Sequence, residues 1–447
     1  MNTQERSIGV GGVFVTLVGL VIGISIYILP GSLAATAGPA VIVSYSLAAL
    51  MALFGCVVAA QIGAMFPISG ASFFAISRLL SPFIGFIAIW FMIGAAAVAT
   101  GLIAYGFADY LNSLWPVANR KILAYLIVIL LGALNLIGTK ETVKWQTLMV
   151  VAFMLALVVF GLVGSVNINF ELLDPFMPNG WSSVINAAVP AFFSYAGFML
   201  IIEMAGEIKN PGKTIPLGLG ISFVTVLLAY TVVSLVIVGV IPWSELGSLS
   251  APVSEVANRI MPNWLANVII ITAIAAATSS INALILGYSR DVFALARVQI
   301  LPKKLAQLST KSHVPFNSII VMILLSMIAI TFGGTISDLA TLVVIGMLGL
   351  QLALGFSLLF VHKKLQKRYE NASFKLSPKL LIFFSSGLII CSLAFLGIVV
   401  WGNLKIIIFA SLYLLLGAVF FYFKVTAANK NENLALLISE ELDNSLS

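Results

Sequence analysis

The sequence contains very little charge. Aspartate, glutamate, lysine and arginine make up only 9% of its 447 residues, while 61% of the residues are hydrophobic. A typical soluble domain has about 25% charged residues. No water-soluble fold hides that much apolar surface. The composition therefore excludes a soluble globular protein and indicates one that lies in a lipid bilayer.

Cysteine and histidine are nearly absent. Cys56 and Cys391 both fall in apolar segments, where a thiol acts as a small hydrophobic side chain, so no disulfide framework is predicted. His313 and His362 are far apart in sequence, and no metal-ligand or nucleophile–base spacing is present. We therefore expect no cofactor, no metal site and no enzymatic activity.

The sequence also lacks a basic face of the kind that binds nucleic acid. Its net charge is +7, but the basic residues lie in short segments between apolar runs, which argues against a nucleic-acid partner. The first ten residues are too short and polar for a cleavable signal, and no small-residue cleavage site follows them. We expect the first apolar segment to be a retained helix.

Long hydrophobic runs are what the sequence does have. A helix needs about 20 apolar residues to cross a bilayer. Twelve such segments are predicted, at 9–35, 39–66, 82–113, 120–138, 143–165, 184–206, 216–242, 264–296, 316–333, 336–361, 379–400 and 404–424.

The lysines and arginines predict the orientation. An even number of spans places both termini on one side, and basic residues favour the cytoplasmic side. With cytoplasmic termini, only Arg120, Lys121, Arg259 and Lys405 of the 23 basic residues lie outside. We therefore predict a multi-pass protein of the plasma (inner) membrane with both ends cytoplasmic.

Two segments contain residues that interrupt helices. The first has Gly19, Gly23, Ser25, Pro30 and Gly31, and the sixth has Pro190, Ser194, Tyr195 and Gly197. A glycine weakens a helix by roughly 1 kcal/mol relative to alanine. Glycine-interrupted segments at matching positions of two halves predict discontinuous helices around a binding site at the membrane midplane. Close helix packing through small residues is the alternative interpretation.

Three motifs, in order along the chain, carry a family resemblance. They are GISIYILP at 23–30 with AGPA at 37–40, FFSYAGF at 192–198 with GEIKNPGKTIP at 206–216, and the segment from YSR at 288–290 through LP at 301–302 to VP at 314–315. Together they resemble the amino acid-polyamine-organocation (APC) superfamily of transporters.

The resemblance implies a LeuT-like, all-α membrane fold. It places two inverted repeats of five helices at about 9–165 and 184–361, with broken first and sixth helices and two further helices at 379–424. The transporter domain would cover residues 1–425, and a cytoplasmic tail, either solvated or containing a short helix, residues 426–447. It also implies a secondary carrier for amino acids or related amines. A channel is disfavoured because no repeated pore motif is visible, and an embedded enzyme for the reasons given above.

The broken helices are the predicted substrate site. Free N–H groups at the start of one half-helix suit a carboxylate, and carbonyls at the end of another suit an ammonium group. The candidate binding residues are Gly23, Ile24, Ser25, Phe193, Ser194, Tyr195 and Gly197. Gly23 would admit the substrate to the main chain and Ser25 would add a hydroxyl. The resemblance assigns Phe193 and Tyr195 to closing the pocket, with plain helix packing as the alternative.

Two departures from the family bear on the substrate. Many relatives have Gly-Ser-Gly where this chain has Gly23-Ile24-Ser25, and an acidic residue where this chain has Met199. Without that acid, a small or apolar neutral amino acid is favoured over arginine, and a polyamine or organic amine remains the alternative.

Three coupling modes stay open. Several relatives carry a lysine, whose ammonium group takes the place of a sodium ion, at the position of Phe153. Phe153 supplies no cation, which argues against coupling of that kind. Sodium could instead bind the hydroxyls of Thr278, Ser279 and Ser280 together with carbonyls of the first helix, although such hydroxyls also serve packing. Glu203, after an apolar run, is the candidate proton carrier, unless it faces water at the cytoplasmic exit. Exchange without an ion requires none of these. The sequence does not predict an oligomeric state.

Overall fold

A computed structural model describes residues 6–114, 119–249, 251–332, 336–402, 404–426 and 430–444. In these ranges the protein is all-helical. The longer helices of its first half are α1 (Val10–Val21), α2 (Ser25–Ala37), α3 (Val41–Met65), α4 (Ala71–Leu79), α5 (Pro82–Leu114), α6 (Arg120–Ile137), α7 (Thr139–Val166) and α8 (Gly180–Phe193). Those of the second half are α10 (Pro211–Val240), α12 (Pro252–Ile260), α13 (Asn263–Arg297), α14 (Phe316–Phe332), α15 (Ile336–Leu359), α18 (Pro378–Gly402), α19 (Leu404–Phe421) and α20 (Asn431–Asn444).

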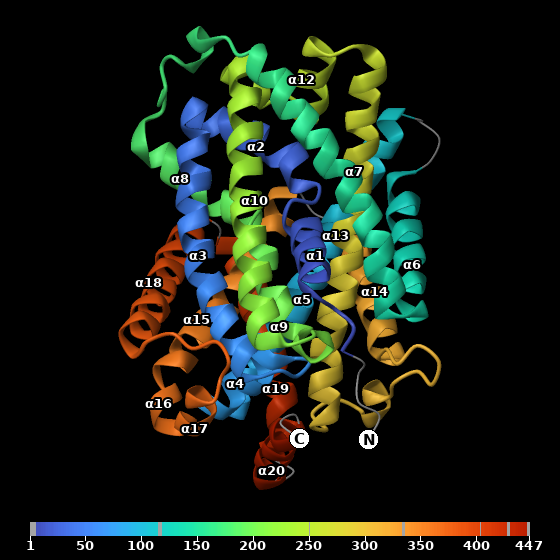
Figure 1. The fold of residues 1–447 in the computed structure, drawn as a ribbon, viewed down its shortest axis with the longest axis vertical. Coiled ribbons are helices and arrows are strands. Elements are labelled where there is room, and N and C mark those ends of the chain that lie inside the picture. Colours follow the sequence, from blue (N-terminus) through green and yellow to red (C-terminus); the bar gives the residue numbers. More distant parts are fainter. Residues whose placement is uncertain are drawn as a thin grey trace.

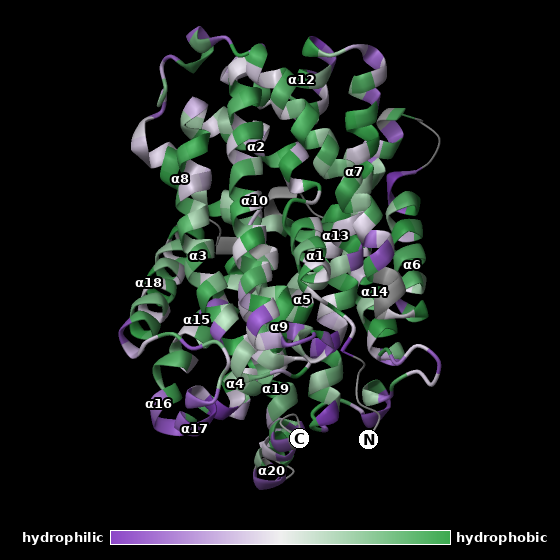
Figure 2. Ribbon diagram, viewed as in Figure 1, coloured by the Kyte–Doolittle hydropathy of each residue, from purple (hydrophilic) through white to green (hydrophobic). Residues whose placement is uncertain are grey.

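The helices form one elongated bundle with an apolar exterior. Ten helices in the described ranges are long and apolar enough to cross a membrane, and two shorter apolar helices cover Val10–Val21 and Phe316–Thr331. Large side chains such as Leu130, Leu155 and Leu162 are more than 60% exposed on the outer faces. Hydrophilic residues gather toward the two ends of the bundle (Figure 2). This arrangement suits a protein surrounded by hydrocarbon.

Helix α13 lies near the centre of the bundle, in contact with α1, α5 and α7. Burial distinguishes inner from outer helices. The most apolar windows of α5 and α13 are 78% and 72% buried, whereas those of α18 and α19 are 28% and 17% buried. The last two apolar helices are therefore peripheral, and the centre is built from helices that precede them.

The first and sixth apolar segments are broken, as the glycine and proline pattern predicts. Helix α1 ends at Val21 and α2 begins at Ser25, with Gly23 between them at a φ of +38°. This φ is in the left-handed region that only glycine adopts readily. In the other segment, α8 ends at Phe193, and 3₁₀ turns at Ala196–Met199 and Ala205–Glu207 flank the single helical turn α9 (Leu200–Glu203).

The two broken segments meet at the lower end of the molecule in Figure 1. Ile8 forms a parallel bridge with Ile208, and the N–H groups of Ser7 and Ile8 both donate to the carbonyl of Glu207, each at 3.0 Å. Helices α4, α9, α16 (Val361–Lys364), α17 (Gln366–Glu370) and α20 lie toward the same end (Figure 1).

The end of the chain is not simply solvated. Residues 427–429 and 445–447 of the predicted tail lie outside the described ranges, but α20 packs against α4 and buries Leu434, Ile438 and Leu442. Glu441 pairs with Arg297. Arg368 donates to the carbonyls of Met65 and Leu442 at 2.7 and 3.2 Å, and its burial lowers its pKa. The tail helix is therefore part of the folded protein.

The predicted orientation can be tested at the upper end. Glu171 is exposed in a 3₁₀ turn between α7 and α8. In a protein from which Cys56 and Cys391 have been removed, a cysteine at position 171 should react with an impermeant thiol reagent added outside cells. A cysteine at Lys367, exposed at the opposite end, should react only after the membrane is opened. The reverse labelling pattern would show that the topology is opposite to the predicted one.

Candidate functional site

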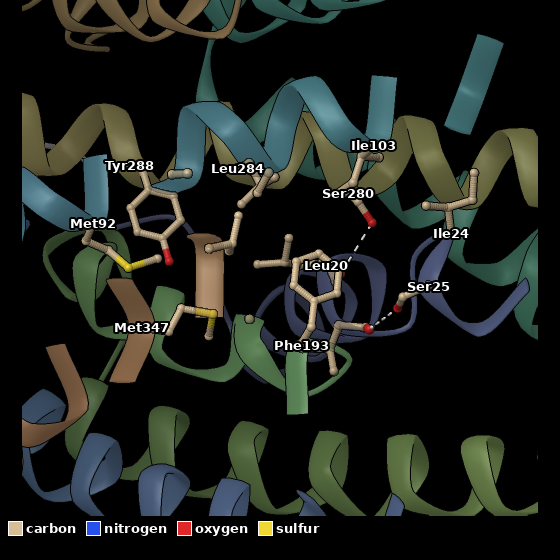
Figure 3. Close-up of a pocket in the computed structure, with 15 residues that line it drawn as sticks. Leu20, Ile24, Ser25, Met92, Ile103, Phe193, Ser280, Leu284, Tyr288 and Met347 are labelled. Carbon is tan, nitrogen blue, oxygen red and sulfur yellow. Dashed lines mark hydrogen bonds between the residues drawn. The ribbon is translucent and has the colours of Figure 1, made fainter. Parts of the chain in front are cut away.

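A cavity lies beside the two helix breaks. It is lined from α1, the break and α2 by Leu20, Val21, Ile24 and Ser25; from α5 by Met92, Ala96, Ala99 and Ile103; from α8 and its break by Phe193 and Gly197; from α13 by Ser280, Leu284 and Tyr288; and from α15 by Val343 and Met347. Its volume is about 40 Å³, room for about three water molecules. Met92, Met347 and Tyr288 lie at one end, and Ser25 and Ser280 at the other (Figure 3).

The lining is almost entirely apolar. Ser25, Ser280 and Tyr288 supply the only side-chain polar groups among the described lining residues, and none of those residues carries a charge. Such a surface favours an apolar ligand group and provides no charged side chain to pair with a charged one. The charged ends of an amino acid would have to be met by main-chain groups or hydroxyls.

Hydroxyl groups cover the end of α1. The last carbonyls of a helix have no partner within it. Ser280 of α13 donates to the carbonyls of Gly19 and Leu20 at 3.0 and 3.3 Å. The hydroxyl of Ser25 donates to the carbonyl of Ile22 at 2.9 Å. Three helices therefore meet at this break.

Tyr230 of α10 completes the cover. Its hydroxyl lies 3.2 Å from the carbonyl of Val21 and 3.3 Å from that of Ile22, and 2.5 Å from the hydroxyl of Ser25. The negative end of the α1 dipole thus lies beside the cavity. At the start of α2, the N–H groups of Ile26 and Tyr27 donate to the carbonyls of Ile22 and Ile24 at 3.3 and 3.0 Å. The negative end of the α1 dipole and the positive end of the α2 dipole therefore lie at the same break.

The structure brings some predicted binding residues to the cavity and places others behind it. Ile24, Ser25, Phe193 and Gly197 line it. Gly23 does not; it packs against Ser280, and a Cβ atom there would overlap the Ser280 hydroxyl.

Ser194 and Tyr195 also lie away from the cavity, and both are buried. Tyr195 joins an aromatic cluster, with ring centroids 6.4 Å from Tyr45 and 5.5 Å from Tyr230. Tyr45 and Tyr230 themselves stack at 4.8 Å. Tyr195 thus packs against Tyr230, whose hydroxyl contacts Ser25 at the cavity.

The sequence analysis did not find the lining residues of α5 and α15. Met92, Ala96, Ala99, Val343 and Met347 belong to uninterrupted apolar helices. Their residue types do not differ from those of ordinary packing positions. Tyr288 opens the third family motif, but that motif by itself does not indicate a place at the cavity.

The three hydroxyls of the sodium hypothesis have different neighbours. Thr278 bonds back to the carbonyl of Ile274 at 2.8 Å, while Ser280 covers α1. The hydroxyl of Ser279 is buried and has no hydrogen-bond partner in the described part of the chain. The space beside Gly19 is occupied by Ser279 and by the amide of Gln146.

That amide belongs to a buried chain of polar groups. Gln146 of α7 donates to the carbonyl of Ser279 at 3.5 Å and accepts from Asn282 of α13 at 3.4 Å. Asn135 of α6 donates to Asn282 at 2.8 Å. An amide chain thus joins α6, α7 and α13 beside α1, where the hypothesis would place an ion. Phe153, at the position where several relatives carry a lysine, is fully buried.

Glu203 does not face water. Its side chain belongs to a residue only 1% exposed, and it accepts hydrogen bonds from the hydroxyl and the N–H of Ser72 on α4. The alternative of a solvated carboxylate at the cytoplasmic exit therefore does not describe this structure.

Comparison with known proteins agrees with this architecture. A family profile described as "Amino acid permease" matches residues 8–438. The branched-chain amino acid permease BcaP of Bacillus subtilis (strain 168) is 28% identical over 423 residues, covering 87% of this chain and 88% of its own length. BcaP of Lactococcus lactis subsp. cremoris (strain MG1363) is 28% identical over 436 residues, covering 91% of each chain. The methylthioribose transporter of B. subtilis (strain 168) is 29% identical over 320 residues, covering 67% of this chain and 69% of its own. This integral membrane protein therefore belongs to the amino acid permease family of the APC superfamily.

Proposed function

We propose that this permease carries small or apolar neutral amino acids, branched-chain ones among them, across the plasma membrane by alternating access. The observation that supports this most is the cavity lining, which is apolar and lacks any charged side chain in the described residues. The substrate carboxylate would bind the N-terminal end of α2, and its ammonium the carbonyl end of α1. Ser25, Ser280 and Tyr230 would orient these groups, and the apolar lining would hold the side chain.

The relatives support this choice of substrate. Two of them are branched-chain amino acid permeases that align over most of their length. A third is a methylthioribose transporter, so an uncharged thioether sugar belongs in the set of compounds to be tested.

The decisive measurement is uptake of labelled leucine into proteoliposomes. It should saturate, and unlabelled leucine inside the vesicles should accelerate it, as a carrier requires. Isoleucine and valine should compete, whereas arginine and putrescine should not. Competition by arginine or putrescine would contradict a neutral substrate. Non-saturating uptake without acceleration from the other side would contradict a carrier.

A larger side chain at Ala99 should exclude the larger substrates. Ala99 lines the cavity and is 4% exposed, so Ala99→Leu would take space that a substrate side chain needs. Steric discrimination of this size corresponds to roughly 10- to 200-fold in affinity. We expect leucine to lose affinity in this range and alanine to lose much less. The same change at Ala133, exposed on α6, should leave both affinities unchanged.

For coupling, we propose that a proton drives accumulation and that Glu203 binds it. The supporting observation is the burial of this carboxyl inside the bundle. An ionisable residue is energetically costly there, which makes it a candidate for a functional role. Sodium at Ser279 and Ser280 is the competing hypothesis, and exchange without an ion the third. Uptake into substrate-free vesicles under a pH gradient or a sodium gradient distinguishes all three.

A further inference from the structure

A second carboxyl group is buried against Glu203. Asp291 of α13 is fully buried, and Glu203 is only 1% exposed. The two side chains lie within hydrogen-bonding range of each other. No donor among the described residues gives a hydrogen bond to either oxygen of Asp291. Their contact is a hydrogen bond only when one of the two carboxyls holds a proton.

The surroundings supply hydrogen bonds but little opposing charge. Ser72 donates to Glu203 from its hydroxyl and, at 3.4 Å, from its N–H. Arg290 precedes Asp291 in sequence but directs its guanidinium to Glu207, with two contacts of 2.6 and 3.1 Å. Helices α1 and α3, which also pack against α9, contain no charged residue. Besides Arg290 and Glu207, Tyr288 is a third titratable group close to the pair.

Two ionised carboxylates in such a place would lose their hydration and repel each other. One shared proton removes most of that cost, because the protonated group then donates to the ionised one. We propose that Glu203 and Asp291 form a single proton-binding site that holds one proton while it is closed from water and releases it when the cytoplasmic end opens. The pair takes up the proton on closure, changing from two negative charges to one, and returns it to water on opening.

The position of the pair connects it to the cavity. Tyr288 lines the cavity, and Asp291 lies three residues later on α13, on the same side of the helix. Glu203 ends α9, in the interrupted segment that starts at the cavity with Phe193 and Gly197. A substrate that moves this segment relative to α13 would therefore separate or join the two carboxyls.

This inference rests on the proposed carrier function, so its test measures exchange and accumulation separately. Asp291→Asn should abolish accumulation of labelled leucine under an imposed inward proton gradient, reducing it to the level without a gradient. Exchange of labelled for unlabelled leucine should stay within about twofold of the original protein, and its pH profile should flatten. Glu203→Gln should behave alike. The control Glu171→Gln alters an exposed carboxylate and should change neither property.

An exchanged pair tests whether the two carboxyls act together. Glu203→Asp combined with Asp291→Glu keeps two carboxyls at one site and should restore gradient-driven accumulation that each neutral variant lost. If Asp291→Asn accumulates leucine normally while Glu203→Gln does not, the shared site is wrong but the carrier function and the role of Glu203 stand. If the unmodified protein exchanges leucine but ignores a proton gradient, proton coupling fails and amino acid transport stands.

A spectroscopic measurement covers the case in which a neutral variant does not fold. The unmodified protein at neutral pH should show the infrared band of a protonated carboxyl, while exposed carboxylates are ionised. The double variant Glu203→Gln with Asp291→Asn, if it folds, should lack the band. Absence of the band from the unmodified protein would overturn the shared proton.

Discussion

Replacing Gly23 by valine should abolish leucine binding. The φ of +38° at this residue is strongly unfavourable for a β-branched side chain and costs about 1–3 kcal/mol. A Cβ atom would also overlap the hydroxyl of Ser280, which covers the carbonyl end of α1. The variant can relieve the backbone strain and the overlap with Ser280 only by moving the break, which displaces the groups proposed to hold the substrate. Leucine affinity in proteoliposomes and thermal unfolding should be measured together.

Two comparisons make this result specific. Gly220 has no atom within 4 Å of an added Cβ, so Gly220→Val should bind leucine normally. Gly23→Ala keeps the backbone strain and the overlap with Ser280 but adds less bulk than valine, and should lose less leucine affinity than Gly23→Val. Normal leucine affinity in Gly23→Val would place the substrate elsewhere.

Removing one partner of the buried Glu207–Arg290 pair should be the most destabilising single change. The two side chains are 4% and 0% exposed, and their closest contact is 2.6 Å. Loss of one partner of such a pair leaves an uncompensated buried charge and costs about 3–5 kcal/mol. We therefore expect Arg290→Met to lower the unfolding temperature strongly in detergent and to reduce the yield of folded protein.

The double variant and a surface pair provide the controls. Glu207→Gln with Arg290→Met leaves no net charge behind and should cost less than Arg290→Met alone. Arg259 makes two such contacts in solvent, with Glu245 at 3.2 Å and with Glu255 at 3.0 Å, and all three side chains are at least 38% exposed. Arg259→Gln should cost only about 0–1 kcal/mol. An equal loss from Arg259→Gln and Arg290→Met would show that burial does not govern the effect.

Sequence by itself determined the class of this protein. Low charge and long apolar runs indicate a membrane environment, because an apolar run of about 20 residues is long enough to cross the hydrocarbon as a helix. A helix also satisfies its own backbone hydrogen bonds, which hydrocarbon cannot do. The sequence also indicated where helices break, since Gly23 and Gly197 interrupt an otherwise regular pattern and breaks are local events. Pro190, by contrast, lies inside the continuous helix α8. These features depend on neighbours in the chain, so they are readable without a fold.

Only the tertiary structure decided which residues face the cavity. In an apolar helix of a membrane protein, the positions toward lipid and toward the interior are both hydrophobic, so Met92 and Ala99 resemble lipid-facing residues in sequence. For the same reason the sequence assigns Tyr195, two residues after Phe193 in the broken segment, to the cavity. In the structure Tyr195 packs on Tyr45 and Tyr230 instead.

The Glu203–Asp291 pair shows most clearly what the sequence reveals and what only the tertiary structure decides. Glu203 was recognisable in the sequence because a charge inside an apolar run is conspicuous. Asp291 was not, because it lies among Arg290 and other polar residues near a predicted cytoplasmic end. The two are 88 positions apart in the chain, and only the packing of α9 against α13 brings them into contact. Long-range pairing of this kind depends on the whole bundle and leaves no local signal in the sequence.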